Sequence, residues 1–295
     1  MATTRDIKRR ITSVQNTRKI TKAMEMVAAA RLRRAAERIE NTRPFALQMM
    51  EFIAGLAGYL EVDPSEFPLL KQHEQVKRVA LVVLTADRGL SGAFNANIVR
   101  AALQRYREYQ VEGIEADLIV VGKRGVGTLR FQNYQMDRTY VGITDMPSFP
   151  DAQAISYRVA ELYAEERVDR VHLIFNSFKS AMEQIVTDQV ILPIQEELVP
   201  EFLPEAATIN LNFIFEPPAS VILRELLPRY LDMTLYRALL ESTASEHGAR
   251  MTAMRNASES ASEMIDQLTL AMNRVRQASI TQEILEVVAG ADALE

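Results

Sequence analysis

The sequence predicts an α/β central domain joined to a long antiparallel coiled coil that is formed by the helices at the two chain ends. Strand-like and helix-like stretches alternate between about residues 75 and 215, which is typical of a sheet covered by helices. A heptad pattern of apolar and small residues runs through 254–278, and another helical pattern occupies the first 60 residues. We therefore expect an N-terminal helix (1–60), a globular domain (61–216) and a C-terminal helix (217–295).

The composition indicates a folded protein and excludes several classes of function. The chain has 295 residues, of which 48% are hydrophobic, enough for one large domain or two ordinary ones. It has no run of 18 uncharged apolar residues, so no transmembrane helix is expected. It also has no cysteine, which excludes disulfides, thiol catalysis and cysteine-ligated iron–sulfur clusters.

The N-terminal segment is strongly basic. Residues 1–43 contain twelve Lys or Arg and four acidic residues, a net charge of +8, and the remaining 252 residues carry −13. Such an excess favours an acidic partner or a nucleic acid, unless it is only a solvated helix face. The arginine-rich start also resembles an organellar transit peptide, but its helical periodicity favours mature structure. Because no signal peptide is present, a cytosol-facing location is expected.

The first 60 residues are expected to form a long helix. Thr3 and Thr4 are suitable N-caps. The apolar positions of the helix are Ile7, Ile11, Val14, Ile20, Met24, Val27, Leu32 and Ile39. The heptad slips between Val14 and Ile20, which indicates a local irregularity of the supercoil. Pro44 predicts a kink or a division of the helix, because proline lacks the N–H that a helix interior needs.

The central domain is predicted from continuous apolar runs that alternate with helical patterns. Strands are expected at 78–87, 116–125, 134–143, 170–178, 183–194 and 209–217, and helices at about 96–109, from Gly125 onward and at 152–166. The strands at 170–178 and 183–194 are joined by a short polar turn, so they are expected to form a hairpin. This order predicts a Rossmann-like, mostly parallel sheet with helices on both faces.

The C-terminal helix is the longest predicted element. Pro228 suits its first turn. Its heptad seam consists of Met254, Ala257, Ala261, Met264, Leu268, Ala271, Val275 and Ala278, with spacings that alternate between three and four. Small and flexible side chains at these positions predict close packing against another helix. Because both terminal helices join the same central domain, they are expected to pair antiparallel.

A second apolar face is expected near the C-terminus. The seam continues at Leu285, whereas Ile280, Ile284 and Val287 fall on the opposite side of the helix. A helix that is apolar on two faces is buried on two faces. One face is therefore expected to meet a different chain.

Motifs for catalysis or cofactor binding are weak or absent in this sequence. The loop DRGLSGAF at 87–94 lies where an α/β protein binds phosphate, but it matches neither GxGxxG nor GxxxxGK[ST]. A tight structural turn is the preferred interpretation there, and also at the glycine-rich stretch 122–127. The three histidines lack the spacing of metal ligands. No GxSxG or HExxH motif occurs.

Long stretches of the chain closely resemble the gamma subunit of F-type ATP synthases. They are RDIKRRITSVQNTRKITKAMEMVAAARLRRA, LTADRGLSGAFNANI, YRALLESTASEHGARMTAMRNAS and RQASITQEILEVVAG. The resemblance implies a central rotor shaft that transmits rotation of the membrane c-ring to the catalytic beta subunits. It implies contacts with the alpha and beta hexamer, epsilon and the c-ring. It implies a peripheral location on the cytoplasmic face of a bacterial plasma membrane or another energy-transducing membrane, and no catalytic residue, cofactor, small-molecule substrate or nucleic acid of the chain's own.

The resemblance also implies roles for particular residues. Arg276 and Gln277 match positions that contact the catch loop of beta, and Thr281 and Glu283 match neighbours that are important for coupling. Ile280, Ile284 and Val287, the second apolar face, suit an apolar sleeve around the tip. Met24 and Arg250 match positions where the shaft meets the levers of beta.

Two departures and two alternatives accompany this interpretation. Ser91 replaces a cysteine that is common in the family, and without any cysteine the chain lacks the thiol switch of chloroplast relatives. The position of the N-terminal motif close to Met1 predicts a bacterial origin.

The alternatives are an α/β enzyme that binds a nucleotide at Gly89–Phe94, and a coiled coil that binds nucleic acid through its basic segment.

Overall fold

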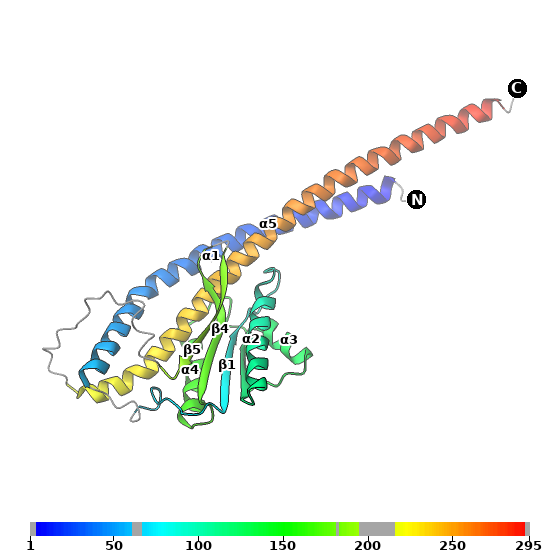
Figure 1. Cartoon of the computed structure of the whole chain (residues 1–295). Coiled ribbons are helices and arrows are strands. Elements are labelled where there is room, and N and C mark those ends of the chain that lie inside the picture. The colour runs from blue at the N-terminus through cyan, green and yellow to red at the C-terminus, as the bar shows by residue number, and fades with distance from the viewer. Residues whose placement is uncertain (1–3, 61–66, 181–182, 195–215, 293–295) are drawn as a thin grey trace. The chain divides into compact units, whose positions relative to one another are not determined.

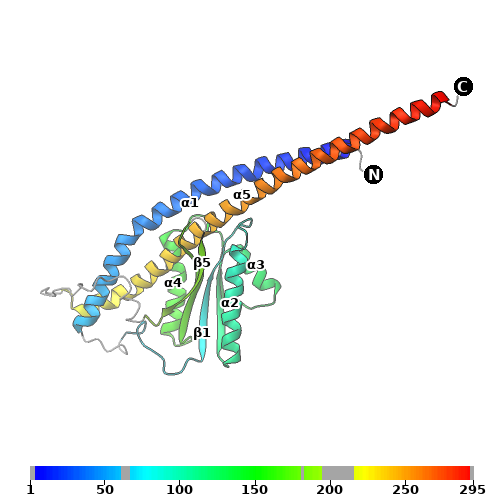
Figure 2. The ribbon, with the colours of Figure 1, turned by 45° about the horizontal axis from the view of Figure 1, so that its top comes forward.

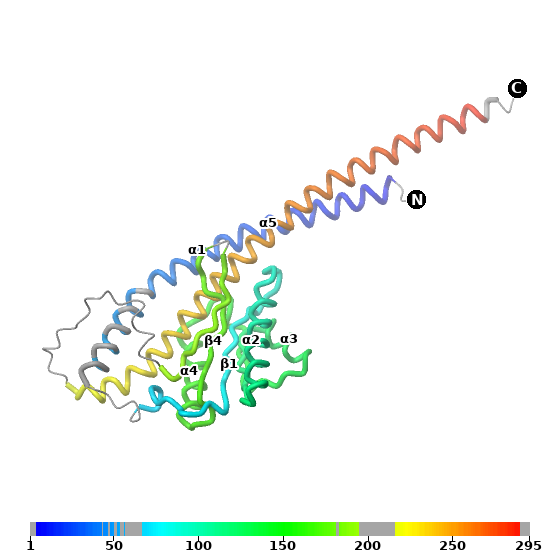
Figure 3. The backbone as a smooth tube through the Cα atoms, viewed as in Figure 1, coloured from blue at the N-terminus to red at the C-terminus, as the bar shows by residue number. Residues whose placement is uncertain are grey.

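The computed structural model describes residues 4–60, 67–180, 183–194 and 216–292 (Figures 1 and 3). It divides into two compact units. Residues 1–29 and 250–295 form the coil unit, and residues 30–249 form the sheet unit. Two long helices, α1 (Thr4–Leu60) and α5 (Ala219–Asp292), contribute to both units. These units cut across the three segments expected from the sequence.

A five-stranded sheet lies at the centre of the sheet unit, with strand order β3-β2-β1-β4-β5. The strands are β1 (Arg78–Leu84), β2 (Glu115–Val121), β3 (Arg138–Tyr140), β4 (Arg170–Phe178) and β5 (Gln184–Leu192). All neighbouring pairs are parallel except β4 and β5, which form the predicted antiparallel hairpin. The mostly parallel sheet is therefore confirmed.

Helices cover both faces of this sheet, as predicted (Figure 1). On one face, Val79, Leu81 and Val83 of β1 pack with α2 (Phe94–Val111) and α3 (Lys123–Phe131). On the other face, Ala80, Val82 and Leu84 pack with α4 (Phe149–Ala164) and with α5 residues between 223 and 239. Successive β1 residues thus point to opposite faces, and both faces are buried, which explains the uninterrupted apolar run.

The structure corrects some predicted boundaries. Pro228 does not begin the last helix, because α5 starts at Ala219 and contains Pro228. The carbonyl of Pro218 accepts hydrogen bonds from Val221 and Ile222, and Leu223 and Leu227 are already buried in the core. Pro44 does not divide α1, which is continuous through it. The strand expected at 209–217 falls outside the described residues except for its last two positions.

The turn between β2 and α3 depends on a glycine. Gly122 has φ +94°, and a Cβ built there would lie 2.3 Å from the carbonyl oxygen of Thr85. The Thr85 hydroxyl donates to Val121 O at 2.6 Å and accepts from the N–H of Gly125 at 2.9 Å. The close approach of these backbones explains the glycine-rich stretch as a structural turn.

Gly122→Ala is expected to lower the free energy of unfolding by about 3 kcal/mol, since it combines backbone strain with steric overlap. Urea denaturation of the full chain measures this loss. Gly127→Ala is the matched control, because a Cβ at Gly127 meets nothing within 4 Å and alanine favours the helix. Equal stability of the two variants would contradict the steric explanation.

Candidate interaction surface on the terminal helices

In the coil unit, α1 and α5 pair in an antiparallel arrangement (Figure 2). The hydroxyls of Thr21 and Ser258 lie 2.7 Å apart in a buried hydrogen bond. The Nη1 of Arg18 donates to the hydroxyl of Ser262 at 3.2 Å. Residue numbers fall along α5 as they rise along α1, so the predicted antiparallel pairing is confirmed.

The contact face of α1 differs from the predicted one. Ile20 and Val27 are 61% and 55% exposed, whereas Thr21 and Ala28 are buried. Together with Ile7, Ile11, Val14, Arg18 and Glu25, these two residues keep an unbroken 4-3 spacing. The predicted slip of the heptad is therefore wrong, because polar residues occupy seam positions that the apolar pattern skips.

The contact face of α5 is also shifted from the predicted seam. Met254 and Ala261 are buried as expected, but Met264 is 50% exposed and Ala278 is exposed. The stripe that faces α1 passes instead through Met254, Ser258, Ala261, Ile265, Leu268, Met272 and Val275. The prediction differs from the structure at every second position. Ala257 is predicted where Ser258 makes the contact, because Ser258 is polar. At 264–265 and 271–272 both neighbouring residues are apolar or small, so the pattern does not distinguish between them.

A basic groove of about 620 Å³ runs beside the Thr21–Ser258 contact. Four basic side chains line it, namely Arg18, Lys19, Lys22 and Arg255. Two of them pair with carboxylates, because Lys22 lies 2.9 Å from Glu25 and Arg255 lies 3.5 Å from Glu259. The groove therefore keeps a net positive charge, which suits an acidic partner surface.

The C-terminal end of α5 extends past the start of α1 (Figure 2). The Thr21–Ser258 pairing places Thr4, where α1 begins, opposite the region of Val275. Beyond it the predicted tip residues are all exposed, namely Arg276, Gln277, Ile280, Thr281, Glu283, Ile284 and Val287. Their apolar members are 46%, 58% and 73% exposed for Ile280, Ile284 and Val287. We call residues 276–288 the tip.

The polar groups of the tip bond within their own helix. The Thr281 hydroxyl donates to Gln277 O at 2.9 Å, and the Ser279 hydroxyl donates to Glu283 Oε1 at 3.5 Å. The other two predicted contact residues lie elsewhere in the coil unit, with Met24 half-buried on α1 and Arg250 buried on α5. Arg250 and Arg276 are separated by about 39 Å of helix, so the predicted residues form two separate groups.

In the sheet unit, the crevice where an α/β protein binds a ligand is filled. The strand order reverses between β1 and β4, and ligands bind beyond the carboxyl ends of such strands. Here α5 covers these ends, since Ser245 donates to Asn176 O at 3.2 Å and Thr243 donates to Thr144 O at 3.0 Å. The cavity that remains holds about 10 Å³, about the space of one water molecule.

The carboxylate of Asp87 occupies the position that a bound anion would take at the start of α3. Its Oδ1 accepts from the backbone N–H groups of Lys123 and Gly142, at 3.0 and 2.9 Å. Its Oδ2 accepts from the backbone N–H and the hydroxyl of Thr144, at 3.1 and 2.9 Å. Burial raises the pKa of Asp87, but these hydrogen bonds outweigh burial and hold the pKa below its ordinary value.

These observations argue against the nucleotide-binding alternative. The loop from Gly89 to Phe94 is closed by a bond between residues on either side of it, since the side chain of Asn95 accepts from Ala86 N at 2.8 Å, and Ser91 and Phe94 within it are buried. In the part of the chain that the structure describes, no group of three or more acidic or histidine side chains is arranged to hold a metal ion. Among the described helices, none is long and apolar enough to span a membrane.

Comparison with known proteins places the whole chain in one family. The sequence profile described as ATP synthase matches residues 3–294. The ATP synthase gamma chain of Moorella thermoacetica is 45% identical over 295 residues, which are 100% of both chains. That of Geobacter metallireducens is 44% identical over 297 aligned positions, again with full coverage of both chains. The chain belongs to the ATP synthase gamma-chain family.

Two solved structures of ATP synthases contain a chain that is similar to this one. A chain of the Tetrahymena thermophila mitochondrial ATP synthase central stalk and c-ring is 31% identical, with a TM-score of 0.59 over 81% of this chain and 99% of that one. A rotor chain of the Euglena gracilis mitochondrial ATP synthase has a TM-score of 0.66 over 94% and 98%. At 19% identity, the second likeness supports the fold alone.

Four residues of the gamma-family coil escaped the sequence interpretation. Arg18, Thr21, Ser258 and Ser262 join the two helices through polar contacts. Arg18, Thr21 and Ser258 keep a 4-3 spacing with Ile11, Val14 and Ala261, but this signal is visible only when polar residues are allowed at seam positions.

Asp87→Asn is expected to destabilise the full chain by about 2 kcal/mol at pH 7, because the amide turns a donor toward groups that donate. The folded pKa of Asp87 is lowered, so its contribution is present above the ordinary carboxyl pKa and is lost as the pH falls through the folded pKa. Urea denaturation at pH 7 and at about pH 3 is expected to show a difference from wild type that shrinks in acid.

Asp117→Asn is the control for this measurement. Burial, as the largest cause, raises the pKa of Asp117, so removing its charge is not expected to destabilise the protein at pH 7. A loss at Asp87→Asn that does not depend on pH would contradict the role assigned to the carboxylate.

Proposed function

We propose that this chain is the central-stalk rotor subunit of an F-type ATP synthase. It transmits rotation of the membrane c-ring to the catalytic beta subunits and so couples ATP synthesis or hydrolysis to proton transport. The observation that carries this proposal is the 45% identity, over the full length of both chains, to a relative named ATP synthase gamma chain. Similarity to this relative over the full length supports the same role for this chain.

The coil unit suits the role of a shaft inside a hexamer of alpha and beta subunits. Its tip carries apolar residues that no partner helix covers among the described residues, and these suit an apolar sleeve formed by the hexamer. Arg276, Gln277, Thr281 and Glu283 are exposed beside them, where they are available to the catch loop of beta.

The basic groove suits the second set of contacts with the hexamer. The groove is lined by α1 residues from Arg18 to Met26, and Met24 lies within this stretch. An acidic lever of beta that approaches this face meets Arg18, Lys19 and Lys22. Arg250 and Met24 are assigned to this lever contact, and the tip residues to the catch loop and sleeve.

The chain itself has a mechanical role and performs no bond chemistry in this proposal. The catalytic sites belong to beta, while the sheet unit and the base of the coil contact epsilon and the c-ring. The complex places the chain at the cytoplasmic face of a bacterial plasma membrane or of another energy-transducing membrane, as a peripheral subunit.

Reconstitution tests the proposal. The purified chain alone is expected to hydrolyse no ATP, and its addition to alpha and beta subunits is expected to permit steady ATP hydrolysis by the assembled complex. Copurification with alpha, beta and epsilon from cells is the second measurement. If the alpha and beta subunits hydrolyse ATP equally well without the chain, the rotor function is excluded.

Ile284→Asp or Val287→Asp is expected to reduce ATP-driven proton pumping by vesicles that contain the complex, by at least about tenfold, because a buried unpaired charge costs several kcal/mol. Glu286→Ala is the control from the same exposed helix and is expected to retain pumping, since it removes only a bond from Gln282 at 2.9 Å. Similar small effects of all three substitutions would contradict an apolar sleeve around the tip.

A further inference from the structure

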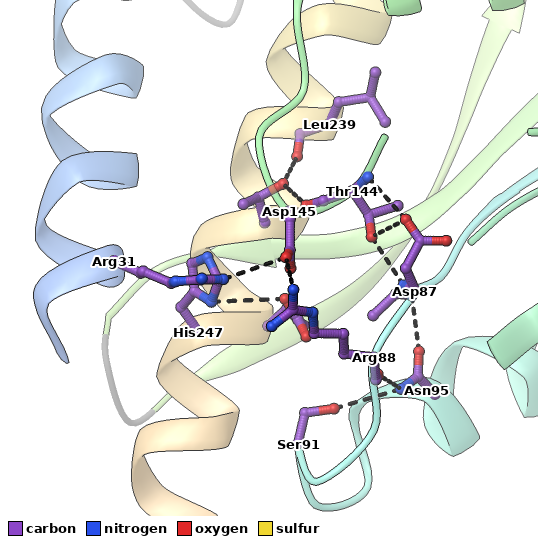
Figure 4. A network of polar contacts seen from close by, with 12 residues as sticks. Arg31, Asp87, Arg88, Ser91, Asn95, Thr144, Asp145, Leu239 and His247 are labelled. Carbon is purple, nitrogen blue, oxygen red and sulfur yellow. Dashed lines mark hydrogen bonds and ion pairs between the residues drawn. The ribbon is translucent and has the colours of Figure 1, made fainter. Parts of the chain in front are cut away.

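The loop of residues 142–145 contacts the segment after β1, α5 and α1 within the sheet unit, and Figure 4 shows Thr144 and Asp145 of this loop among their partners. The N–H of Gly142 and both donors of Thr144 bond to Asp87, which also receives the N–H of Lys123 at the start of α3. The carbonyl of Thr144 accepts from Thr243 of α5 at 3.0 Å. The carboxylate of Asp145 then reaches two arginines from different elements.

Asp145 joins α1 to the loop that follows β1. Its Oδ2 lies 3.3 Å from Nη1 of Arg31, which belongs to α1, and 2.9 Å from Nη2 of Arg88. Among the described side chains of α1 from residue 30 to 60, Arg31 is the only one with a hydrogen bond or ion pair to another element. Apolar contact of α1 with the core cluster of the sheet comes much later, at Met49 and Ile53.

The backbone next to Asp145 is fixed by hydrogen bonds that do not involve its ion pairs. An exposed ion pair contributes little on its own, partly because it orders two long side chains. Asp145 follows Thr144, whose N–H, hydroxyl and carbonyl are all hydrogen-bonded. The same carboxylate of Asp145 binds both arginines. Because Arg88 already restricts the rotamers of Asp145, less side-chain entropy is lost when Arg31 binds to it.

We infer that Asp145 is a positioning residue that fastens α1 to the sheet unit through Arg31. The loop of residues 142–145 already binds α5 through Thr243, so this contact holds both terminal helices against one rigid backbone segment. Its mechanical consequence rests on the proposed rotor function, because a shaft transmits torque only when its helices are fixed to its base.

The structural part is tested on the isolated full chain. Since the chain has no cysteine, spin labels are introduced without background at Arg34→Cys on α1 and at Met146→Cys, which is exposed and adjacent to Asp145. Pulsed electron paramagnetic resonance then gives the distribution of distances between the two labels. A single narrow distribution is expected with Asp145 intact.

Asp145→Ala and Arg31→Ala are each expected to broaden this distribution, whereas Asp145→Glu is expected to keep it narrow. Arg88→Ala is expected to have a smaller effect, because it removes only the group that positions the carboxylate. Glu161→Ala, which breaks a different pair with Arg158 at 2.7 Å, is the control. A distribution that stays narrow in both Asp145→Ala and Arg31→Ala would overturn the inference.

The mechanical part is tested in the assembled complex. Asp145→Ala is expected to lower the number of protons pumped per ATP hydrolysed while hydrolysis continues, and Asp145→Glu is expected to restore the ratio. An unchanged ratio in Asp145→Ala would overturn this part. Failure of the wild-type chain to support hydrolysis excludes the rotor function, and leaves the distance result to decide whether Asp145 fastens α1.

Discussion

The antiparallel register of α1 and α5 is the constraint on which the interaction surfaces depend. The Thr21–Ser258 contact aligns the helices, so the residues of α1 and α5 that face each other follow from it. The same alignment makes α1 begin near Val275 and leaves the apolar residues of the tip uncovered. It also creates the basic groove, because Lys19 and Lys22 lie across from Arg255. One alignment therefore produces two surfaces of opposite character, one apolar and one charged.

In the described part of the sheet unit, internal contacts fill the position where an α/β architecture often provides a ligand site. The crevice beyond β1 and β4 is filled by α5, whose Thr243 and Ser245 replace possible ligand contacts with internal ones. At the start of α3, the carboxylate of Asp87 accepts a hydrogen bond from the backbone N–H of Lys123, a group that could otherwise bind an anion. The glycine-rich turns serve close backbone packing, as Gly122 shows. The sheet unit holds the long helices in place, and the candidate interaction surfaces lie outside the sheet.

Elements with strong periodicity were predictable, and contacts between distant polar residues were not. The strands β1, β2 and β4 were visible because both faces are buried, which leaves a continuous apolar run. The role of Asp87 was not visible, because its partners Gly142 and Thr144 lie more than fifty residues away. In the coil, the apolar pattern predicts Ile20 and Val27 at the helix contact, but both are exposed. Nothing in the sequence around Thr21 indicates that its hydroxyl faces another helix.

The uncovered end of α5 affects how tightly a partner can bind it. Residues 276–292 are seventeen positions of single helix past the start of α1. This segment continues a helix that is already nucleated, so each turn adds only the small gain of propagation, with no packed face to support it. The tip is therefore the part of α5 where packing does least to prevent fraying. A partner that encloses the tip would hold its frayed turns in the helix, and the energy of ordering them would be subtracted from the affinity of that partner.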